Sequence, residues 1–433
     1  MRFELPRGMR DIEDEEYMLI EHLRHRFIET ARLFGFSMVE PSPVELLSTL
    51  EAKSGPMISN EIYAFKDKAG RDIALRFDLT VGLTRYVAGR RDLKMPIKLA
   101  AFGPVWRYDE PQMGRYRWFH QWDVEVYDNF NIESDAEVIE FTKYYFDSLG
   151  IPVRIEISDR KMLEGMIRKR LGVEDEQMVL DMLRAVDKLS KKSKDAIIQE
   201  YTAKGIDVGR LRSLLEMIVG LRGSIDDILS SDHLKGIDID ASRLTALVDS
   251  LKARGIGDMV VNMSIVRGLD YYSSIVFEVF SEKSNLALVG GGRYDVLPEV
   301  FGRKDIGATG AAGGIERLVL LLKDMRYGSD ILYGNDKARA SIFVAYTDDR
   351  LKGDAMMLTS NLRRKGVKSE CIAASLKRQL DYASSKGYRF AAILTDRMSR
   401  ENIVVLKDMI DGSERTVQFN ALLTNPSAAI ISI

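Results

Sequence analysis

Three arginines stand close together in the segment GPVWRYDEPQMGRYRWFHQWDVE, residues 103–125. Arg107, Arg115 and Arg117 are set there among aromatic and acidic residues. The pattern predicts a strand, a tight loop and a returning strand, which would bring Arg107 and Arg115 near each other across a hairpin. Guanidinium groups bind phosphate oxygens in pairs, and Phe119 could stack on a base. The same pattern also fits a surface hairpin whose arginines form cross-strand ion pairs.

Other segments hold polar residues that could contact a ligand, and all of them except LRFDLT also contain glycine. They are LRFDLT (75–80), IVRGLDYY (265–272), LVGGGRYD (288–295) and GAAGGIERLVLLL (310–322). The three glycines 290–292 either permit close approach by a ligand or form a bulge. Arg317 lies at a predicted strand-to-helix junction, from which it could reach over a sheet. Because neither a GxxxxGK[ST] loop nor a GxGxxG turn after a strand is present, side chains would have to hold any nucleotide phosphates.

The elements that position these residues follow from hydrophobic spacing. Apolar residues at spacing four predict a helix over 14–34, followed by a short strand over 36–40. Short aromatic runs between 73 and 126 indicate antiparallel strands, followed by a helix over 133–149 and a strand over 153–157. Aromatics nearly vanish over 160–258, where Leu, Ile, Val and Met recur at helical spacing. Strand patterns then return and lead to a helix over 315–325, so the body is predicted to be α+β with a helical insertion.

The C-terminal stretch has a different pattern and a different charge. Strand and helix alternate over residues 337–433, which predicts a small α/β domain with a partly parallel sheet. This stretch carries 16 Lys and Arg against 10 Asp and Glu, a net charge of +6, so the other residues sum to -8. It is the better candidate for meeting a polyanion, although a solvated helix face would carry the same charge.

Composition excludes several classes of protein. The 433 residues are 45% hydrophobic and 30% charged, with a net charge of -2, so the chain is neither disordered nor a uniformly basic coat for nucleic acid. One cysteine, Cys371, and four scattered histidines give neither a disulfide framework nor a zinc cluster. The N-terminal residues are charged, and the chain holds no unbroken apolar run near 18 residues. We therefore expect a cytoplasmic protein with no membrane segment.

Taken together, these motifs resemble the histidyl-tRNA synthetases, a family of class II aminoacyl-tRNA synthetases, over nearly the whole chain. The helix and strand before Pro41 resemble the first class motif, residues 103–125 the second, and GIERL the third; RGLDYY and GGGRYD are specific to the histidine enzymes. The resemblance implies a homodimer with an antiparallel-sheet catalytic domain over 1–159 and 259–330. It also implies a helical insertion domain over 160–258 and an anticodon-binding domain over 337–433.

The resemblance implies ATP-dependent activation of L-histidine, followed by transfer to the 3′ end of tRNA(His). The amino-acid carboxylate attacks the ATP α-phosphate, a reaction that depends on positioning and charge neutralisation. Mg²⁺ is expected to accompany ATP, and no metal is expected to be held by the protein alone. The catalytic residues would be Arg107, Arg267 and Arg317. ATP would be held by Arg107 at the α-phosphate and by Arg115 and Arg317 at the outer phosphates, with adenine between Phe119 and Arg317.

Histidine offers an ammonium group and an imidazole, so a selective site needs acids at both ends. By resemblance, Asp78, Thr80 and Gln121 take the ammonium group, Glu125 and Tyr272 hold the imidazole, and Arg267 and Tyr271 complete the histidine site. From the residues alone, without the resemblance, Asp78 and Glu125 could instead be ion-pair partners of Arg76 or Arg117. Such a polar pocket rejects analogues well enough that no editing domain is expected.

The resemblance also implies contacts with tRNA. In two places the chain differs from the pattern of the family. Gln112 would meet the first base pair of the acceptor stem, while the insertion, with its basic run DKLSKKSKD, either approaches that stem or is merely solvated. Many bacterial relatives have His-Glu-Arg where this chain has Tyr108, Asp109 and Glu110, and bulkier residues where it has Ala311 and Gly313. Rival interpretations are a non-catalytic paralogue, such as the regulatory subunit of ATP phosphoribosyltransferase, a related synthetase for proline or threonine, and a plain RNA-binding regulator.

Overall fold

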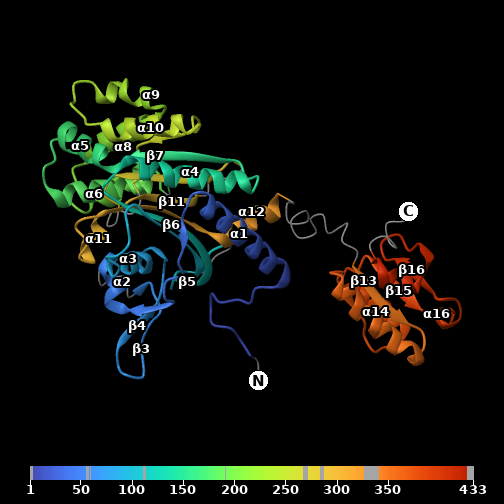
Figure 1. Ribbon diagram of the computed structural model, residues 1–433. Coiled ribbons are helices and arrows are strands. Elements are labelled where there is room, and N and C mark those ends of the chain that lie inside the picture. The colour runs from blue at the N-terminus through green and yellow to red at the C-terminus, as the bar shows by residue number, and fades with distance from the viewer. Residues whose placement is uncertain are drawn as a thin grey trace. The chain divides into compact units, whose positions relative to one another are not determined.

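The computed structural model describes residues 3–54, 58, 60–110, 114–190, 192–266, 272–282, 287–325 and 341–426. The chain divides into two compact units, Met1–Met325 and Arg326–Ile433 (Figure 1), which are described separately below. Among the helices of the described ranges, none has the length and apolar character needed to cross a membrane.

The first unit is organised around a nine-stranded sheet, and the predicted α+β class with an antiparallel-rich sheet is confirmed. The strand order is β1-β5-β6-β12-β11-β10-β7-β9-β8. The pairs β1–β5 and β7–β9 are parallel and the other pairs are antiparallel. The bounds are β1 Ser37–Met38, β5 Ile97–Trp106, β6 Trp118–Asp128, β7 Val153–Asp159, β8 Arg222–Gly223, β9 Val260–Asn262, β10 Ile275–Ser281, β11 Ala287–Arg293 and β12 Gly307–Gly314.

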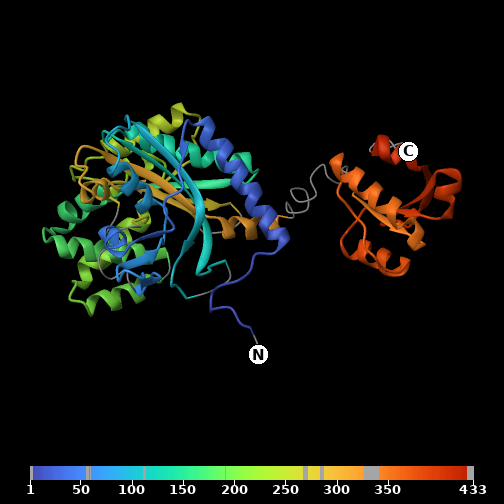
Figure 2. The same ribbon diagram turned by 60° about the horizontal axis from the view of Figure 1, so that its bottom comes forward.

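Three helices pack against the central strands of this sheet: α1 (Asp14–Leu33), α4 (Ile132–Ser148) and α12 (Ile315–Asp324). The spacing-four residues of α1 are fully buried, as the sequence predicts, and Figures 1 and 2 show α1 beside β5 and β6. Phe27 of α1 packs on Trp122 of β6, with ring centroids 5.7 Å apart. Aromatic burial of this kind contributes about 2–3 kcal/mol per ring and fixes the sheet under the helices.

A small three-stranded sheet, β2-β4-β3, comes directly before α3 in the chain. The residues between β4 and α3 form the LRFDLT motif, so Asp78 and Thr80 sit at the junction of a strand and a helix. Arg76 fixes this junction, because its buried side chain bonds the Pro104 carbonyl oxygen at 2.8 Å and also the Pro41 carbonyl oxygen. The bounds are β2 Val44–Leu46, α2 Leu47–Ser54, β3 Ala64–Lys66, β4 Asp72–Leu75, α3 Thr80–Ala88 and α11 Val296–Val300.

Helices occupy most of residues 160–258, as the loss of aromatics predicts. Several begin at a side-chain cap; the carboxylate of Asp175, for example, accepts from the Met178 amide at 2.8 Å. The prediction missed β8, which adds a short edge to the large sheet. The bounds are α5 Arg160–Leu171, α6 Glu176–Asp187, α7 Lys194–Thr202, α8 Val208–Gly220, α9 Ile225–Leu229 and α10 Ser242–Ala253.

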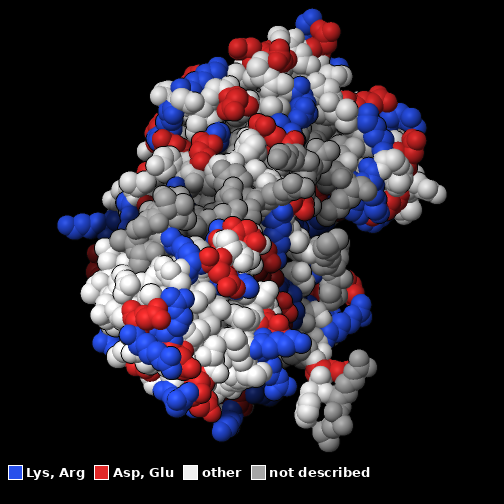
Figure 3. Space-filling model, turned by 90° about the vertical axis from the view of Figure 1, so that its right-hand side faces the viewer, with Lys and Arg blue, Asp and Glu red and all other residues white. Residues whose placement is uncertain are grey.

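The second unit has a five-stranded sheet of order β14-β13-β15-β16-β17 with a parallel half and an antiparallel half, which confirms the predicted partly parallel sheet. Its basic residues are mixed with acids, as in the ion pairs Arg350–Asp348 and Lys407–Glu414. On the face of the molecule that Figure 3 draws, residues of both signs are interspersed. The bounds are β13 Ile342–Tyr346, α14 Lys352–Arg364, β14 Ser369–Glu370, α15 Leu376–Ser385, β15 Phe390–Leu394, α16 Asp396–Glu401, β16 Ile403–Asp408, β17 Glu414–Gln418 and α17 Phe419–Thr424.

Candidate active site

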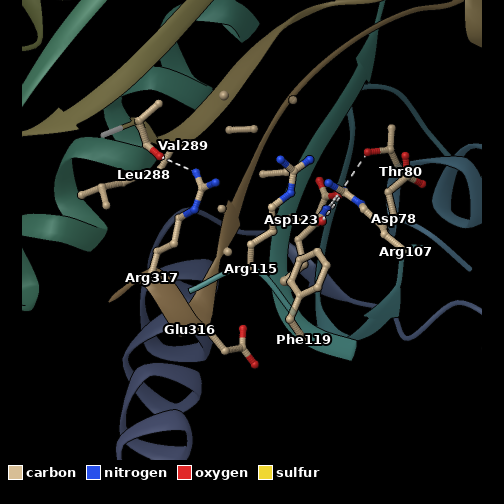
Figure 4. A pocket seen from close by; sticks show the side chains of 18 of the residues that line it. Asp78, Thr80, Arg107, Arg115, Phe119, Asp123, Leu288, Val289, Glu316 and Arg317 are labelled. Atoms are coloured by element: carbon tan, nitrogen blue, oxygen red, sulfur yellow. Dashed lines mark hydrogen bonds between the residues drawn. The ribbon is translucent and has the colours of Figure 1, made fainter. Parts of the chain in front are cut away.

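A cavity of about 710 Å³ lies over the central strands of the nine-stranded sheet (Figure 4). Asp187, at the end of α6, contributes to its wall, so the helical stretch takes part in the site. Nine of the residues predicted from the sequence line the cavity: Asp78, Thr80, Arg107, Arg115, Phe119, Gln121, Glu125, Tyr272 and Arg317. The predicted site residues Gln112, Arg267 and Tyr271 lie outside the described residues.

Strand β6 supplies a row of four lining residues because side chains alternate between the two faces of a strand. Phe119, Gln121, Asp123 and Glu125 line the cavity. Trp122 lies on the other side, against α1 and α4. Three of these four residues were predicted from the sequence. Asp123 was not, although its even spacing from Gln121 and Glu125 is a signal that could have found it.

Glycines of β12 create the room that the β6 side chains occupy. Gly310 is opposite Glu125 in the strand register, and a Cβ on Gly310 would lie 1.6 Å from Glu125 Oε2. A Cβ on Gly313 would lie 2.4 Å from the indole nitrogen of Trp122. The small residues of β12 thus accommodate large neighbours on β6, which gives the departure at Gly313 a physical reason.

One end of the cavity is acidic. Asp123 is completely buried, and its Oδ2 accepts from Thr80 Oγ1 at 3.1 Å and from Gln121 Nε2 at 3.3 Å. Burial, reinforced by the neighbouring carboxylates of Glu125 and Asp78, raises the pKa of Asp123 well above its usual range. Its Oδ1 is buried without a hydrogen-bond partner among the described residues, so this end of the cavity is suited to a cationic group.

Two tyrosines flank Glu125 at this end. Tyr294 donates its hydroxyl to Glu125 Oε2. Burial, together with nearby acids, raises the pKa of Tyr272, so this phenol stays protonated and able to donate. Tyr294, which belongs to the GGGRYD motif, was not assigned a role from the sequence.

Arginines line the rest of the cavity, called the arginine end below, and Arg107 lies where it meets the acidic end. Arg107 donates from Nε to the Phe77 carbonyl at 2.8 Å and from Nη2 to Gln121 Oε1 at 3.2 Å, and its guanidinium lies 5.2 Å from the Phe119 ring centroid. Arg317 reaches from the start of α12 and donates to the Ala287 carbonyl at 2.8 Å. Figure 4 shows Arg107, Arg115 and Arg317 directed into the same cavity.

The arginines of the hairpin between β5 and β6 show features of both interpretations, a ligand site and a surface hairpin with ion pairs. Arg115 lines the cavity and pairs with Asp109 at 2.7 Å, as the surface-hairpin alternative predicted. Arg117 is structural: it donates to the Asp109 carbonyl at 3.0 Å and stacks on Tyr108 at 3.8 Å. Asp78 and Glu125, for which Arg76 or Arg117 was the alternative partner, both line the cavity.

Glu316 connects the helix start to the hairpin. Its carboxylate accepts from the His120 backbone amide at 2.9 and 3.0 Å and lies 3.1 Å from His120 Nδ1. Figure 4 shows it turned away from Arg317, its neighbour in sequence. The contact therefore fixes the start of α12, and with it Arg317, relative to β6.

Comparisons with known proteins place this geometry in context. Residues 8–318 match the family model described as histidyl-tRNA synthetase, and residues 340–425 match that of an anticodon binding domain. The histidine–tRNA ligase of Pyrococcus furiosus is 33% identical over 96% of this chain and 97% of its own length, and that of Thermococcus kodakarensis is 34% identical over 96% of each. The fold is similar to a crystal structure of histidyl-tRNA synthetase from Nostoc sp. PCC 7120, with TM-score 0.77, 23% identity and 98% of each chain covered. It is also similar to an ATP phosphoribosyltransferase regulatory subunit/histidyl-tRNA synthetase from Bacillus halodurans, with TM-score 0.72, 22% identity, and 91% of this chain and 99% of that chain covered.

Proposed function

The chain belongs to the histidyl-tRNA synthetase family, and we propose that its cavity binds histidine at the acidic end and ATP at the arginine end. Its function is that of a histidine–tRNA ligase, an aminoacyl-tRNA synthetase. The observation that carries the residue assignment is that one cavity gathers acids from LRFDLT and residues 103–125 together with arginines from residues 103–125 and GIERL.

At the acidic end, Asp78, Thr80 and Gln121 bind the α-ammonium group of histidine. We add Asp123 to this set, because its buried Oδ1 has no partner among the described residues and an ammonium group would supply one. Glu125 and Tyr272 bind the two imidazole nitrogens, and Tyr294 holds Glu125 in place. The pocket selects histidine because an analogue without these donors would leave buried acids unpaired.

At the arginine end, Arg107 contacts the α-phosphate, while Arg115 and Arg317 contact the outer phosphates. A carboxylate oxygen of histidine attacks the α-phosphorus, the bond to the bridging oxygen breaks, and pyrophosphate leaves with the electron pair. In the second step, a terminal ribose hydroxyl of tRNA attacks the carbonyl carbon and AMP leaves. Arg107 and Arg317 offset the charge that develops in the first step. Arg267 is assigned beside the α-phosphate by its RGLDYY motif alone.

Mg²⁺ is expected to enter as the ATP complex. Within the described ranges, no cluster of three or more His, Cys, Asp or Glu could hold a metal ion, and the phosphate end presents guanidinium donors. The phosphate oxygens and water would therefore supply the ligands of Mg²⁺, and the ion would neutralise phosphate charge when bound.

Regions outside the cavity would provide most of the contacts with tRNA. We assign acceptor-stem contacts to Gln112 and to the insertion over 160–258, and anticodon contacts to residues 337–433. The catalytic domain would comprise 1–159 and 259–330 and would form a homodimer through the first motif, where Leu33 and Met38 are exposed apolar residues. The expected location is the cytoplasm.

Histidine-dependent exchange of pyrophosphate into ATP, run beside the other amino acids, tests the assignment. Exchange with histidine alone supports it, whereas exchange with proline or threonine would overturn the pocket assignment. No exchange at all would favour the regulatory paralogue. Removal of residues 337–433 is expected to reduce tRNA charging far more than exchange, and equal losses would mean that this region mainly stabilises the enzyme.

A further inference from the structure

Arg293 is a buried arginine behind the cavity, at the end of β11, with only 1% of its side chain exposed. Its Nε donates to Asp135 Oδ2 at 2.9 Å, and its Nη1 donates to Asp128 Oδ1 at 3.2 Å and to Asp295 Oδ1 at 3.3 Å. Its Nη2 donates to the Asn131 carbonyl oxygen at 2.7 Å. One guanidinium thus faces three carboxylates in the interior.

These partners come from elements that carry the imidazole end of the pocket. Asp128 is the last residue of β6, three positions after Glu125, and Asn131 and Asp135 belong to the start of α4. Asp295 directly follows Tyr294, whose hydroxyl bonds Glu125. Arg293 therefore ties the end of the strand that holds Glu125 to the turn that holds Tyr294.

A second connection runs to Tyr272. The Arg293 carbonyl oxygen accepts from the Ser273 amide at 2.7 Å, and Asp295 Oδ2 accepts from Ser273 Oγ at 3.0 Å. Asp295 Oδ1 also accepts from the Ala308 amide on β12 at 3.1 Å. Since Ser273 follows Tyr272 in the chain, the same group of residues constrains both tyrosines that flank Glu125.

We propose that Arg293, with Asp128, Asp135, Asp295 and Ser273, is a positioning residue that sets the spacing of Glu125, Tyr272 and Tyr294 around the imidazole of histidine. The inference rests on the proposed histidine site and extends it to residues that do not touch the substrate. It gives the RYD part of the GGGRYD motif a role. A shift of the tyrosines by a fraction of an ångström would lengthen the hydrogen bonds to both ring nitrogens and weaken histidine binding without disturbing the arginine end.

Two mild variants test the proposal. Arg293→Lys keeps the positive charge but loses the planar fork that reaches several partners at once. Ser273→Ala removes one hydroxyl and leaves no buried charge unpaired, so it is the variant expected to fold in every case. Arg303→Gln is the matched control, because Arg303 is also a buried arginine that pairs with a carboxylate, Asp305 at 2.8 Å.

The measurements are KM for histidine, KM for ATP and kcat in pyrophosphate exchange, together with calorimetric binding of histidinol, which has the ammonium and imidazole groups but no carboxylate. We expect KM for histidine and Kd for histidinol to rise about tenfold in Arg293→Lys and about threefold in Ser273→Ala. KM for ATP and kcat should stay within about twofold of wild type, and Arg303→Gln should change neither KM.

Unchanged histidine and histidinol affinity in folded Ser273→Ala and Arg293→Lys would overturn the proposal. An equal rise in KM for ATP would also overturn it, because it would indicate a general loss of structure. If Arg293→Lys does not fold, Ser273→Ala decides alone. Failure of the wild-type protein to exchange with histidine would instead contradict the proposed site, so the two failures can be distinguished.

Discussion

The two ends of the cavity are built differently. At the acidic end, Asp123 and Glu125 are 0% and 1% exposed, and each carboxylate is held by hydrogen bonds from neighbouring strands and helices. At the arginine end, the side chain of Arg115 is 50% exposed and pairs with Asp109, which is 24% exposed. The acidic end is prepared in the folded protein, while the arginine end holds cations that can exchange protein partners for phosphate oxygens.

This difference separates the two tasks of the site. A buried, prearranged set of acids discriminates between amino acids, because a wrong ligand leaves polar groups unpaired where water cannot reach them. Arginines that contact the reacting phosphate act mainly on the rate, because charge develops there in the transition state. Substitutions at one end should therefore move different kinetic constants from substitutions at the other.

The largest effect is expected from Arg107→Ala. Removal of this guanidinium should lower the rate of histidine-dependent pyrophosphate exchange about 10³-fold, since it contacts the α-phosphate in the proposed complex. Arg107→Lys should recover part of the loss, because the charge returns without the fork. A loss smaller than about tenfold in Arg107→Ala would contradict the division between the two ends.

Glu125→Gln tests the acidic end and should lower kcat/KM for histidine about 10²-fold, which corresponds to about 2.7 kcal/mol. The amide has nearly the size of the carboxylate, so it still fits against Gly310, and its oxygen can still accept from Tyr294, but it lacks the negative charge that binds the imidazole in the proposed complex. KM for ATP should not change. A matching rise in KM for ATP would mean that the two ends are coupled.

The support behind the acidic end carries its own electrostatic cost. Burial raises the pKa of Asp135 to about 6, from an ordinary aspartate value of 3.8, despite the opposing effect of Arg293. A raised folded-state pKa means that the charged carboxylate is unfavourable in the folded protein above pH 6. The penalty is relieved as the pH falls from 6 towards 3.8 and the folded state takes up the proton first.

The variant Asp135→Asn is the reference, because its amide does not titrate. The difference between wild type and this variant therefore reports the titration of Asp135. Relative to this variant, the wild-type free energy of unfolding should increase by about 2 kcal/mol between about pH 7.5 and about pH 4.5. Urea denaturation at each pH measures the difference. A difference that stays constant, or that falls with decreasing pH, would show that Asp135 is fully ionised and stabilised by Arg293.

The sequence predicts those parts of the site that depend on local order. Strand alternation from Phe119 to Glu125 places side chains at even spacing on one face, and the arginines of the hairpin follow from their own segment. Helix α1 is predicted within one residue because its buried positions recur at spacing four. In each case the information lies within a few residues of chain.

Apart from Asp123, which local spacing could have identified, the missed residues depend on contacts between distant segments. Arg293 and Asp135 are 158 positions apart and meet only when β11 and α4 are in place. Tyr294 gains a role from Glu125, 169 positions away, through the register of three neighbouring strands. No spacing within one segment encodes such pairs, so the supports of the acidic end had to come from the structure.

The smallest effect is expected at the outer loop of the arginine end, where Glu110 pairs with Arg7 at 2.9 Å and both side chains are about three-quarters exposed. Such a pair contributes little to stability, about 0–1 kcal/mol, and is screened by salt. Glu110→Gln should therefore leave exchange unchanged. It should lower KM for tRNA about two- to threefold, because the substitution removes an acid that would face the acceptor-stem phosphates in the proposed complex. Steady-state charging at low ionic strength measures the change. A change in the exchange rate as large as the change in KM for tRNA would show that the Arg7–Glu110 pair positions the hairpin. The exposed charges at the arginine end would then be held as firmly as the buried acids.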